Sequence, residues 1–202
     1  MHQPPIDAVI FDLGGVLASF GGVGPMRDLA GVDSDDEVWR RWLTCRWVRR
    51  FERGACSPED FAAGVVSDWA LPITPEAFLD GFRTWLAGPF PGAEDLVRAV
   101  RKRVPVGCLS NTNSVHWDKS VSQWALVDLF DFRFLSFQLG LLKPDREVFD
   151  YVTRAVDTEP ERLLVLDDNP LNVEGARSAG FQAAQVRGIE EAKKALVEAG
   201  VL

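Results

Sequence analysis

Short apolar runs that end at a polar residue occur at three places along the chain. They are residues 8–11 before Asp12, 106–109 before Ser110 and 163–166 before Asp167. Uninterrupted apolar runs of this length are typical of strands that are buried on both faces of a parallel sheet. Helical spacing lies between them, in segments such as 96–100 and 148–152, so strands and helices alternate through the C-terminal half. This alternation predicts an α/β fold with a doubly wound, Rossmann-like parallel sheet.

Between residues 18 and 88 the alternation is interrupted, and helical spacing dominates. We predict two tryptophan-rich helices around residues 37–53 and 58–69, and a third helix around residues 75–86. The first of these helices contains an apolar ladder with i+4 spacing, which we expect to pack against the other helices. The ladder consists of Trp39, Leu43, Trp47 and Phe51.

Two prolines and a glycine lie between residues 89 and 92, as at a domain boundary or hinge. We therefore expect a core domain of residues 1–17 and 89–202, with a helical cap domain of residues 18–88 inserted into it. In a doubly wound sheet the carboxyl ends of the strands line one crevice where ligands bind. The polar residues that follow the predicted strands are expected to converge in that crevice.

Composition excludes several classes of function. With 202 residues, 47% of them hydrophobic, the chain can bury a substantial core. A formal net charge of −8 argues against a nucleic-acid partner, because binding to phosphate backbones needs clustered positive charge. The N-terminal residues lack a basic patch followed by an apolar stretch, so we expect no membrane association and a cytoplasmic location. Three cysteines without metal-like spacing indicate reduced thiols, and no feature indicates an oligomeric state.

The polar residues near the strand ends have the chemistry of a phosphate site. Asp12 is a strand-end carboxylate, which serves either as a nucleophile or as a turn former. Ser110 and Asn111 offer a hydroxyl, an amide and backbone N–H groups, which suit phosphoryl oxygens but also suit helix capping. Lys143 precedes Pro144, and its ammonium either neutralises a phosphoryl group or is solvated at the surface.

Two adjacent carboxylates, Asp167 and Asp168, end the third apolar run. When buried, such a pair repels unless a cation compensates its charge. Carboxylate oxygens are the ligands that Mg²⁺ prefers, so the pair predicts a magnesium site. One nearby side chain is expected to cap the following helix instead, and the candidates are Asp167, Asp168 and Asn172.

Taken in their order along the chain, these segments resemble the four motifs of the haloacid dehalogenase-like superfamily, over residues 6 to about 180. The resemblance implies an enzyme in which Asp12 forms an aspartyl-phosphate while Ser110 and Lys143 hold the transferring group. It also implies a Mg²⁺ site formed by Asp12, Asp168 and the backbone carbonyl of Gly14. A carboxylate approaches a phosphate dianion only when a metal ion and a lysine offset their repulsion, which agrees with this set of residues.

The predicted cap carries a second resemblance. Glu52-Arg53-Gly54, followed by Ser57 and Phe61, resembles the cap of the subgroup that includes α-glucose-1-phosphate phosphatase. This implies a magnesium-dependent phosphatase that hydrolyses a small phosphate monoester, specifically a sugar phosphate.

Four arginines of the first cap helix share one face, at positions 46, 49, 50 and 53. A solvated face explains this spacing, but a basic rim would also attract phosphate esters. Arg50 is our candidate for a substrate contact.

Gly14 departs from the superfamily pattern, since most of its phosphatases have a second aspartate two residues after the nucleophile. That aspartate protonates the leaving group, and general acid catalysis contributes roughly 10²-fold to 10⁴-fold. Three explanations stay open. A cap residue such as His116 or a carboxylate near Glu52 supplies the proton, a good leaving group such as an anomeric sugar phosphate needs little help, or the site no longer catalyses. His116 is more readily explained as a structural residue.

Two alternative functions remain at this point. A 2-haloacid dehalogenase uses the same aspartate without a metal ion, but the acidic pair Asp167-Asp168 favours the phosphatase. A non-catalytic binding protein would keep the fold without turnover. Retention of four residues together counts against it: Asp12, Ser110, Lys143 and Asp168.

Overall fold

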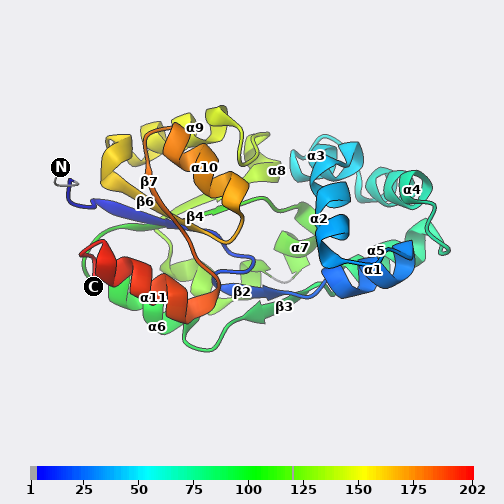
Figure 1. The fold of residues 1–202 in the computed structure, drawn as a ribbon, viewed down its shortest axis with the longest axis horizontal. Helices are drawn as coiled ribbons and strands as arrows, with labels where there is room; N and C mark the ends of the chain where they lie inside the picture. The colour runs from blue at the N-terminus through cyan, green and yellow to red at the C-terminus, as the bar shows by residue number, and fades with distance from the viewer. Residues whose placement is uncertain (1–3, 120) are drawn as a thin grey trace.

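A parallel sheet of five strands forms the centre of the molecule (Figure 1), in the order β5-β4-β1-β6-β7. The structure is a computed structural model that describes residues 4–119 and 121–202. The strands are β1 (Ala8–Phe11), β4 (Val106–Ser110), β5 (Phe132–Leu135), β6 (Leu163–Asp167) and β7 (Gln182–Gln185). The three predicted strands are therefore confirmed. The chain runs from β1 to β4 and β5, then crosses to β6 and β7, so the strand order reverses at β1.

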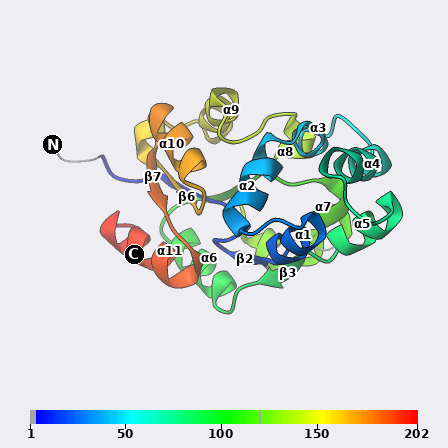
Figure 2. The same ribbon diagram turned by 45° about the vertical axis from the view of Figure 1, so that its right-hand side comes forward.

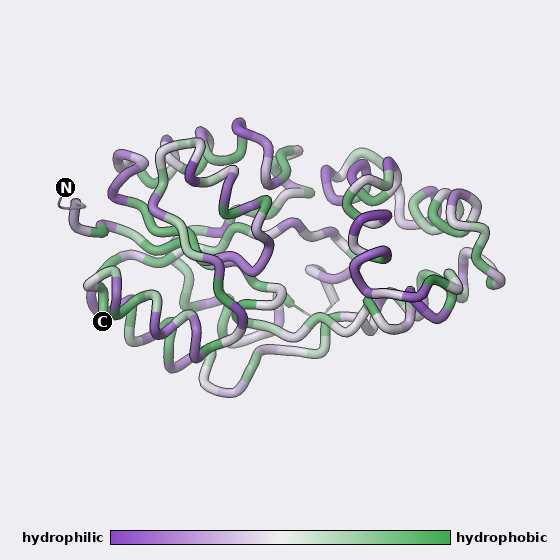
Figure 3. Tube along the Cα trace, viewed as in Figure 1, coloured by the Kyte–Doolittle hydropathy of each residue, from purple (hydrophilic) through white to green (hydrophobic). Residues whose placement is uncertain are grey.

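Helices cover both faces of this sheet, which confirms the predicted doubly wound α/β fold. Helices α6 (Ala93–Arg101) and α11 (Gly188–Glu198) lie on one face, and α9 (Arg146–Val156) and α10 (Pro170–Ser178) lie on the other (Figure 1). Along these helices hydrophilic and hydrophobic stretches alternate, as expected for helices with one face on the sheet (Figure 3).

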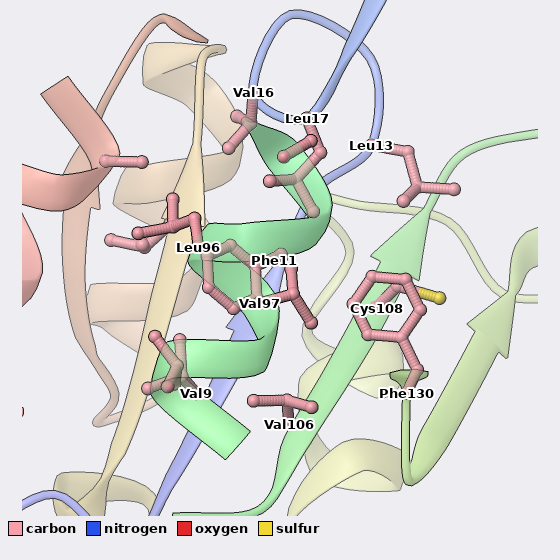
Figure 4. Packing of buried hydrophobic residues seen from close by; sticks show 14 of the residues in the cluster. Val9, Phe11, Leu13, Val16, Leu17, Leu96, Val97, Val106, Cys108 and Phe130 are labelled. Carbon is pink, nitrogen blue, oxygen red and sulfur yellow. The ribbon is translucent and has the colours of Figure 1, made fainter. Parts of the chain in front are cut away.

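Neighbouring residues of β1 contribute to different halves of the core, because successive strand residues point to opposite faces. Phe11 packs in the cluster that includes Val97 of α6, and Figure 4 shows the two side chains together. Ile10 packs in the opposite cluster with Phe149 of α9. All four residues of β1 are buried, which fixes the strand end that carries Asp12.

Five helices form a separate group at the far end of the molecule from both termini (Figures 1 and 2). They are α1 (Val23–Ala30), α2 (Asp35–Thr44), α3 (Arg46–Glu52), α4 (Pro58–Trp69) and α5 (Pro75–Phe82). Their apolar faces enclose a hydrophobic cluster of their own, rich in aromatic rings such as Trp42, Phe61 and Phe82. The cap helices are thus present as a group. Its division from the core at residues 18 and 88 as an independent domain stays a prediction.

Two boundaries within this group differ from the prediction. The helix expected over residues 37–53 is interrupted at Cys45, whose extended backbone (ψ 120°) separates α2 from α3. The predicted burial of the apolar ladder is therefore wrong in its first half. Trp39 is 38% exposed, whereas Trp42 is buried. The helix expected over residues 75–86 ends at Phe82.

A short antiparallel ribbon connects the two parts of the molecule. It pairs β2 (Ala18–Phe20) with β3 (Leu86–Pro89), close to both expected boundaries of the cap. The chain therefore enters and leaves the helical group side by side. Within the described residues, no helix has the length and apolar character needed to cross a membrane.

Candidate active site

The carboxyl ends of β1 and β6 bring Asp12 and Asp167 to the two sides of Lys143. Phe11 pairs with Leu166 in the sheet, so the residues that follow them emerge next to each other. The Lys143 Nζ lies 3.0 Å from Asp12 Oδ1 and 2.6 Å from Asp167 Oδ2. The Lys143 side chain is only 1% exposed. The alternative of a solvated surface lysine is thereby excluded.

Burial and crowding set the ionisation of this group. Burial raises the pKa of Asp12 to about 7; the Lys143 ammonium opposes this shift, while Asp167 and Asp168 add to it. Burial disfavours the charged form of Lys143, but Asp12 and Asp167 outweigh this effect and raise the lysine pKa. One ammonium therefore serves two close carboxylates, and the site holds an excess of negative charge.

The carboxylate of Asp167 is fully engaged by protein donors. Besides Lys143, it accepts hydrogen bonds from the Asn169 N–H at 2.9 Å and from Asn172 Nδ2 at 3.0 and 3.2 Å. These donors hold a fully buried charge in place. Asp167 thus holds the Lys143 ammonium in a fixed position.

The predicted helix cap after β6 is wrong in its residue. Neither of the two aspartates nor Asn172 caps α10, because the Asn169 side chain accepts the hydrogen bond from the Leu171 N–H at 2.9 Å. Asp167 turns back toward Lys143 instead. The capping residue directly follows the acidic pair, so Asp167 is free to bind Lys143 and neither aspartate is used as a helix cap.

Asp168 completes a cluster of three carboxylates. Ligand oxygens of Asp12, Asp167 and Asp168 lie within 4.8 Å of one another. Burial raises the pKa of Asp168, and the neighbouring Asp167 charge adds to this shift. The Asp168 carboxylate forms no ion pair within the described part of the chain, in contrast to Asp167.

The loop after β1 approaches Asp168 so closely that a glycine is required there. A Cβ atom at Gly15 would lie 2.4 Å from Asp168 Oδ2, and the φ of Gly15 is +75°. A Cβ at Gly14 would meet nothing within 4 Å. Sequence reasoning singled out Gly14 for its missing side chain, but the geometry makes Gly15 the position that needs glycine.

Ser110 is the last residue of β4, which pairs with β1 in the sheet. It is buried at the same edge of the sheet as the acidic cluster. Asn111 follows it and binds the backbone of Lys143. The Asn111 Oδ1 accepts from the Lys143 N–H at 2.9 Å, and Nδ2 donates to the Lys143 carbonyl at 3.0 Å. The Asn111 amide therefore positions Lys143, and its predicted contact with substrate stays a prediction.

The cap contacts the same loop through two arginines of α3 and its end. Arg49 Nη2 lies 3.2 Å and Arg53 Nη2 lies 2.5 Å from Asp145 Oδ2, two residues after Lys143. Arg50 is not part of this contact. Its guanidinium lies 5.0 Å from the centre of the Trp47 ring on the exposed side of α3, so its role in substrate binding stays a prediction.

His116 has a structural role in this arrangement. Its ring stacks on Phe82 of α5, with centroids 4.1 Å apart, and Nε2 lies 2.7 Å from the Phe82 carbonyl. A carbonyl only accepts hydrogen bonds, so Nε2 carries the proton and Nδ1 faces Asn113 Nδ2 at 3.4 Å. Both ring nitrogens are occupied, which leaves His116 no free atom for a substrate.

Some of these contacts could not be found from sequence. Asp145 bears no motif signal, although it lies just after Lys143-Pro144, in the loop that holds Lys143. The sequence predicts the Asn111 amide as a phosphate donor, whereas the structure pairs it with the backbone of Lys143.

Comparison with known proteins finds phosphatases among the relatives of this chain. A sesquiterpene phosphatase from Aspergillus oryzae is 28% identical over 179 residues, which cover 86% of each chain. A D-ribitol-5-phosphate phosphatase from Bacteroides thetaiotaomicron is 27% identical over 198 residues, which cover 89% of this chain and 91% of that protein.

The fold and the family follow from two further matches. A solved structure of a haloacid dehalogenase family enzyme from Bacteroides thetaiotaomicron, in complex with magnesium and inorganic phosphate, shares the fold with a TM-score of 0.71. It is 21% identical and covers 90% of this chain and 94% of that chain. The family model of haloacid dehalogenase-like hydrolases matches residues 6–180, and the chain therefore belongs to this family of hydrolytic enzymes.

Proposed function

We propose that the protein is a magnesium-dependent phosphatase that hydrolyses a small phosphate monoester, a sugar phosphate, through an aspartyl-phosphate at Asp12. The observation that carries this proposal is the buried group of Lys143 between Asp12 and Asp167, with Asp168 within 4.8 Å. A single ammonium does not balance three carboxylates, so the site is suited to a further cation.

The donor set fits Mg²⁺, which prefers oxygen ligands and few protein carboxylates. Asp167 is occupied by Lys143, Asn169 and Asn172, so Asp12 and Asp168 are the carboxylates that would hold the ion, together with the Gly14 carbonyl. When bound, the ion offsets the charge of the phosphate ester and of the transition state.

The protein residues then have separable roles. Asp12 Oδ1 accepts from the Leu13 N–H at 2.8 Å and faces Lys143, which fixes the carboxylate and leaves Oδ2 for the ion or the phosphorus. Lys143 reduces the repulsion between the Asp12 carboxylate and the incoming phosphate. The Ser110 hydroxyl, at the end of the adjacent strand, would donate to a phosphoryl oxygen.

Two observations support a phosphate ester as the substrate: the names of the relatives, and the arginines on the cap helix α3. One relative acts on ribitol 5-phosphate and another is a sesquiterpene phosphatase, so both act on phosphate esters. Four arginines lie on α3 and its end, and two of them, Arg49 and Arg53, pair with Asp145 and place positive charge where the cap meets the core.

The test is phosphate release from a panel of sugar phosphates, with magnesium and with a chelator. We expect release that requires magnesium and falls at least about 10³-fold in Asp12→Asn, because the nucleophile is lost. Asp128→Asn, an exposed aspartate of the core, is the matched control and keeps wild-type activity. Magnesium-independent chloride release from a 2-haloacid, or no turnover of any ester, would contradict the proposal.

A further inference from the structure

Two core positions, Gly14 and His116, cannot protonate the leaving group of the proposed reaction. Gly14 has no side chain, and His116 is occupied on both ring nitrogens. In an in-line displacement the ester oxygen leaves on the side opposite the attacking Asp12 oxygen. Asp12 emerges from the sheet, so a donor for that oxygen has to come from the side of the cap.

Helix α3 is a cap element that reaches the core beside the loop of Lys143. It packs against α8 (Ser136–Leu139) in the core, and Figures 1 and 2 both show the two helices next to each other. The turn after α3 lies directly on the core: a Cβ at Gly54, where φ is +66°, would lie 2.3 Å from the Phe137 carbonyl oxygen. The end of α3 is thereby held at a fixed place.

Glu52 is the last residue of α3 and lies between the residues that fix it. Arg49 and Arg53 both contact Asp145, and Glu52 shares the face of Arg49 because residues three apart lie on one side of a helix. That face is turned toward the loop of Lys143. Unlike its neighbours Arg49 and Arg53, Glu52 forms no ion pair with a residue in the ranges that the structure describes.

The electrostatic surroundings of Glu52 are those of the active site. Burial raises the pKa of the half-buried Glu52 to about 7; Arg49 and Lys143 oppose the shift, and Asp12 adds to it. Lys143 and Asp12 belong to the core, so the charges that act on the Glu52 carboxyl come from across the boundary between cap and core. Near neutral pH such a group exists in both protonation states, as a proton donor and acceptor requires.

We propose that Glu52 is the general acid and base that replaces the side chain missing at Gly14. The assignment rests on the proposed phosphatase function. In the first step, an Asp12 oxygen bonds to phosphorus, the bond from phosphorus to the ester oxygen breaks, and the Glu52 proton passes to that oxygen. In the second step, the Glu52 carboxylate takes a proton from water while the water oxygen bonds to phosphorus. The bond to Asp12 breaks, inorganic phosphate leaves, and both carboxyl groups return to their starting states.

The experiment compares two esters in Glu52→Gln, which keeps the shape of the side chain but cannot donate a proton in this way. 4-Nitrophenyl phosphate has a leaving group that needs no proton, whereas glycerol 3-phosphate has an alkoxide leaving group that does. We expect kcat/KM for glycerol 3-phosphate to fall by about 10²-fold to 10⁴-fold, and that for 4-nitrophenyl phosphate by less than about tenfold. Glu59→Gln, an exposed carboxylate of α4, is the matched control and leaves both rates unchanged.

The outcomes separate the two proposals. A thermal unfolding midpoint as high as in the wild type shows that Glu52→Gln is folded. An equal loss on both esters, or no loss on either, would overturn the role of Glu52 while leaving the phosphatase function intact. Failure of the wild type to release phosphate from either ester with magnesium would overturn the phosphatase function, and the role of Glu52 with it.

Discussion

Lys143 is held from three directions. Its backbone binds the Asn111 amide, and its ammonium contacts two carboxylates. A buried charge of this kind is stable only with its partners, and removal of one partner typically costs about 3–5 kcal/mol. The residues that hold Lys143 therefore support both the fold and the charge at the site.

Gly15 provides a test of how closely the loop after β1 must approach Asp168. In Gly15→Ala, the added Cβ collides with the Asp168 carboxylate and the residue is forced to keep a positive φ. We expect a loss of stability of about 1–3 kcal/mol and a weaker response of the thermal midpoint to magnesium.

Gly14→Ala is the control for this variant, since its Cβ meets nothing within 4 Å and its φ is not positive. Thermal unfolding with increasing magnesium measures both proteins. A wild-type magnesium response in Gly15→Ala would show that the position of Asp168 does not depend on this contact.

At the residue scale, sequence predicted the strand-end residues well and their side-chain partners poorly. Asp12 and Asp167 were expected to converge because parallel strands end at one edge, and they do. The bonds of Asn111 and Asn169 depend on how loops fold back, which local spacing does not encode.

Helices α5 and α7 (Ser114–Lys119) connect cap and core through His116 and Phe82. Burial lowers the pKa of His116, although the Phe82 carbonyl opposes the shift. The folded protein therefore binds a proton here less readily than the unfolded chain. The stability that this group contributes is present above the unfolded pKa of 6.5 and is lost as the pH falls below that value.

We predict that His116→Gln reduces this acid sensitivity. Between about pH 7.5 and pH 5.5, the free energy of unfolding of the wild type should fall relative to the variant, by up to about 1.4 kcal/mol per pH unit. Denaturant titrations at each pH measure the difference. Asp12 and Glu52, whose raised pKa values act in the opposite sense, are present in both proteins and cancel. A constant difference across this range would show that His116 is not buried in its neutral form.

The elements that sequence missed are the ones with weak local signals. The ribbon strands β2 and β3 have three and four residues and are mostly half-buried, so neither shows an apolar run or a clear alternation. The break between α2 and α3 at Cys45 also has no neighbouring proline or glycine that would predict it from the sequence. Its extended conformation changes which face of the chain is buried, and Trp42 takes the place expected for Trp39.

At the scale of the molecule, the candidate site lies where the carboxyl edge of the sheet meets α3. The strand order that produces this edge was not readable from one sequence, because it depends on crossovers between distant segments. The fold class was readable, since buried parallel strands and amphipathic helices have distinct periods. The two parts touch at Asp145 and at His116, so the end of α3, which carries Glu52, is held beside the loop of Lys143.

A covalent phosphate on Asp12 is the central step of the proposed reaction. Rapid acid quenching of the enzyme during turnover of a sugar phosphate, followed by mass spectrometry of the peptide that contains Asp12, measures it directly. We predict phosphorylated Asp12 when magnesium and ester are both present, and its loss once the ester is consumed. Phosphate release without phosphorylation of Asp12, or an alkyl ester on Asp12 formed from a 2-haloacid without magnesium, would contradict the account.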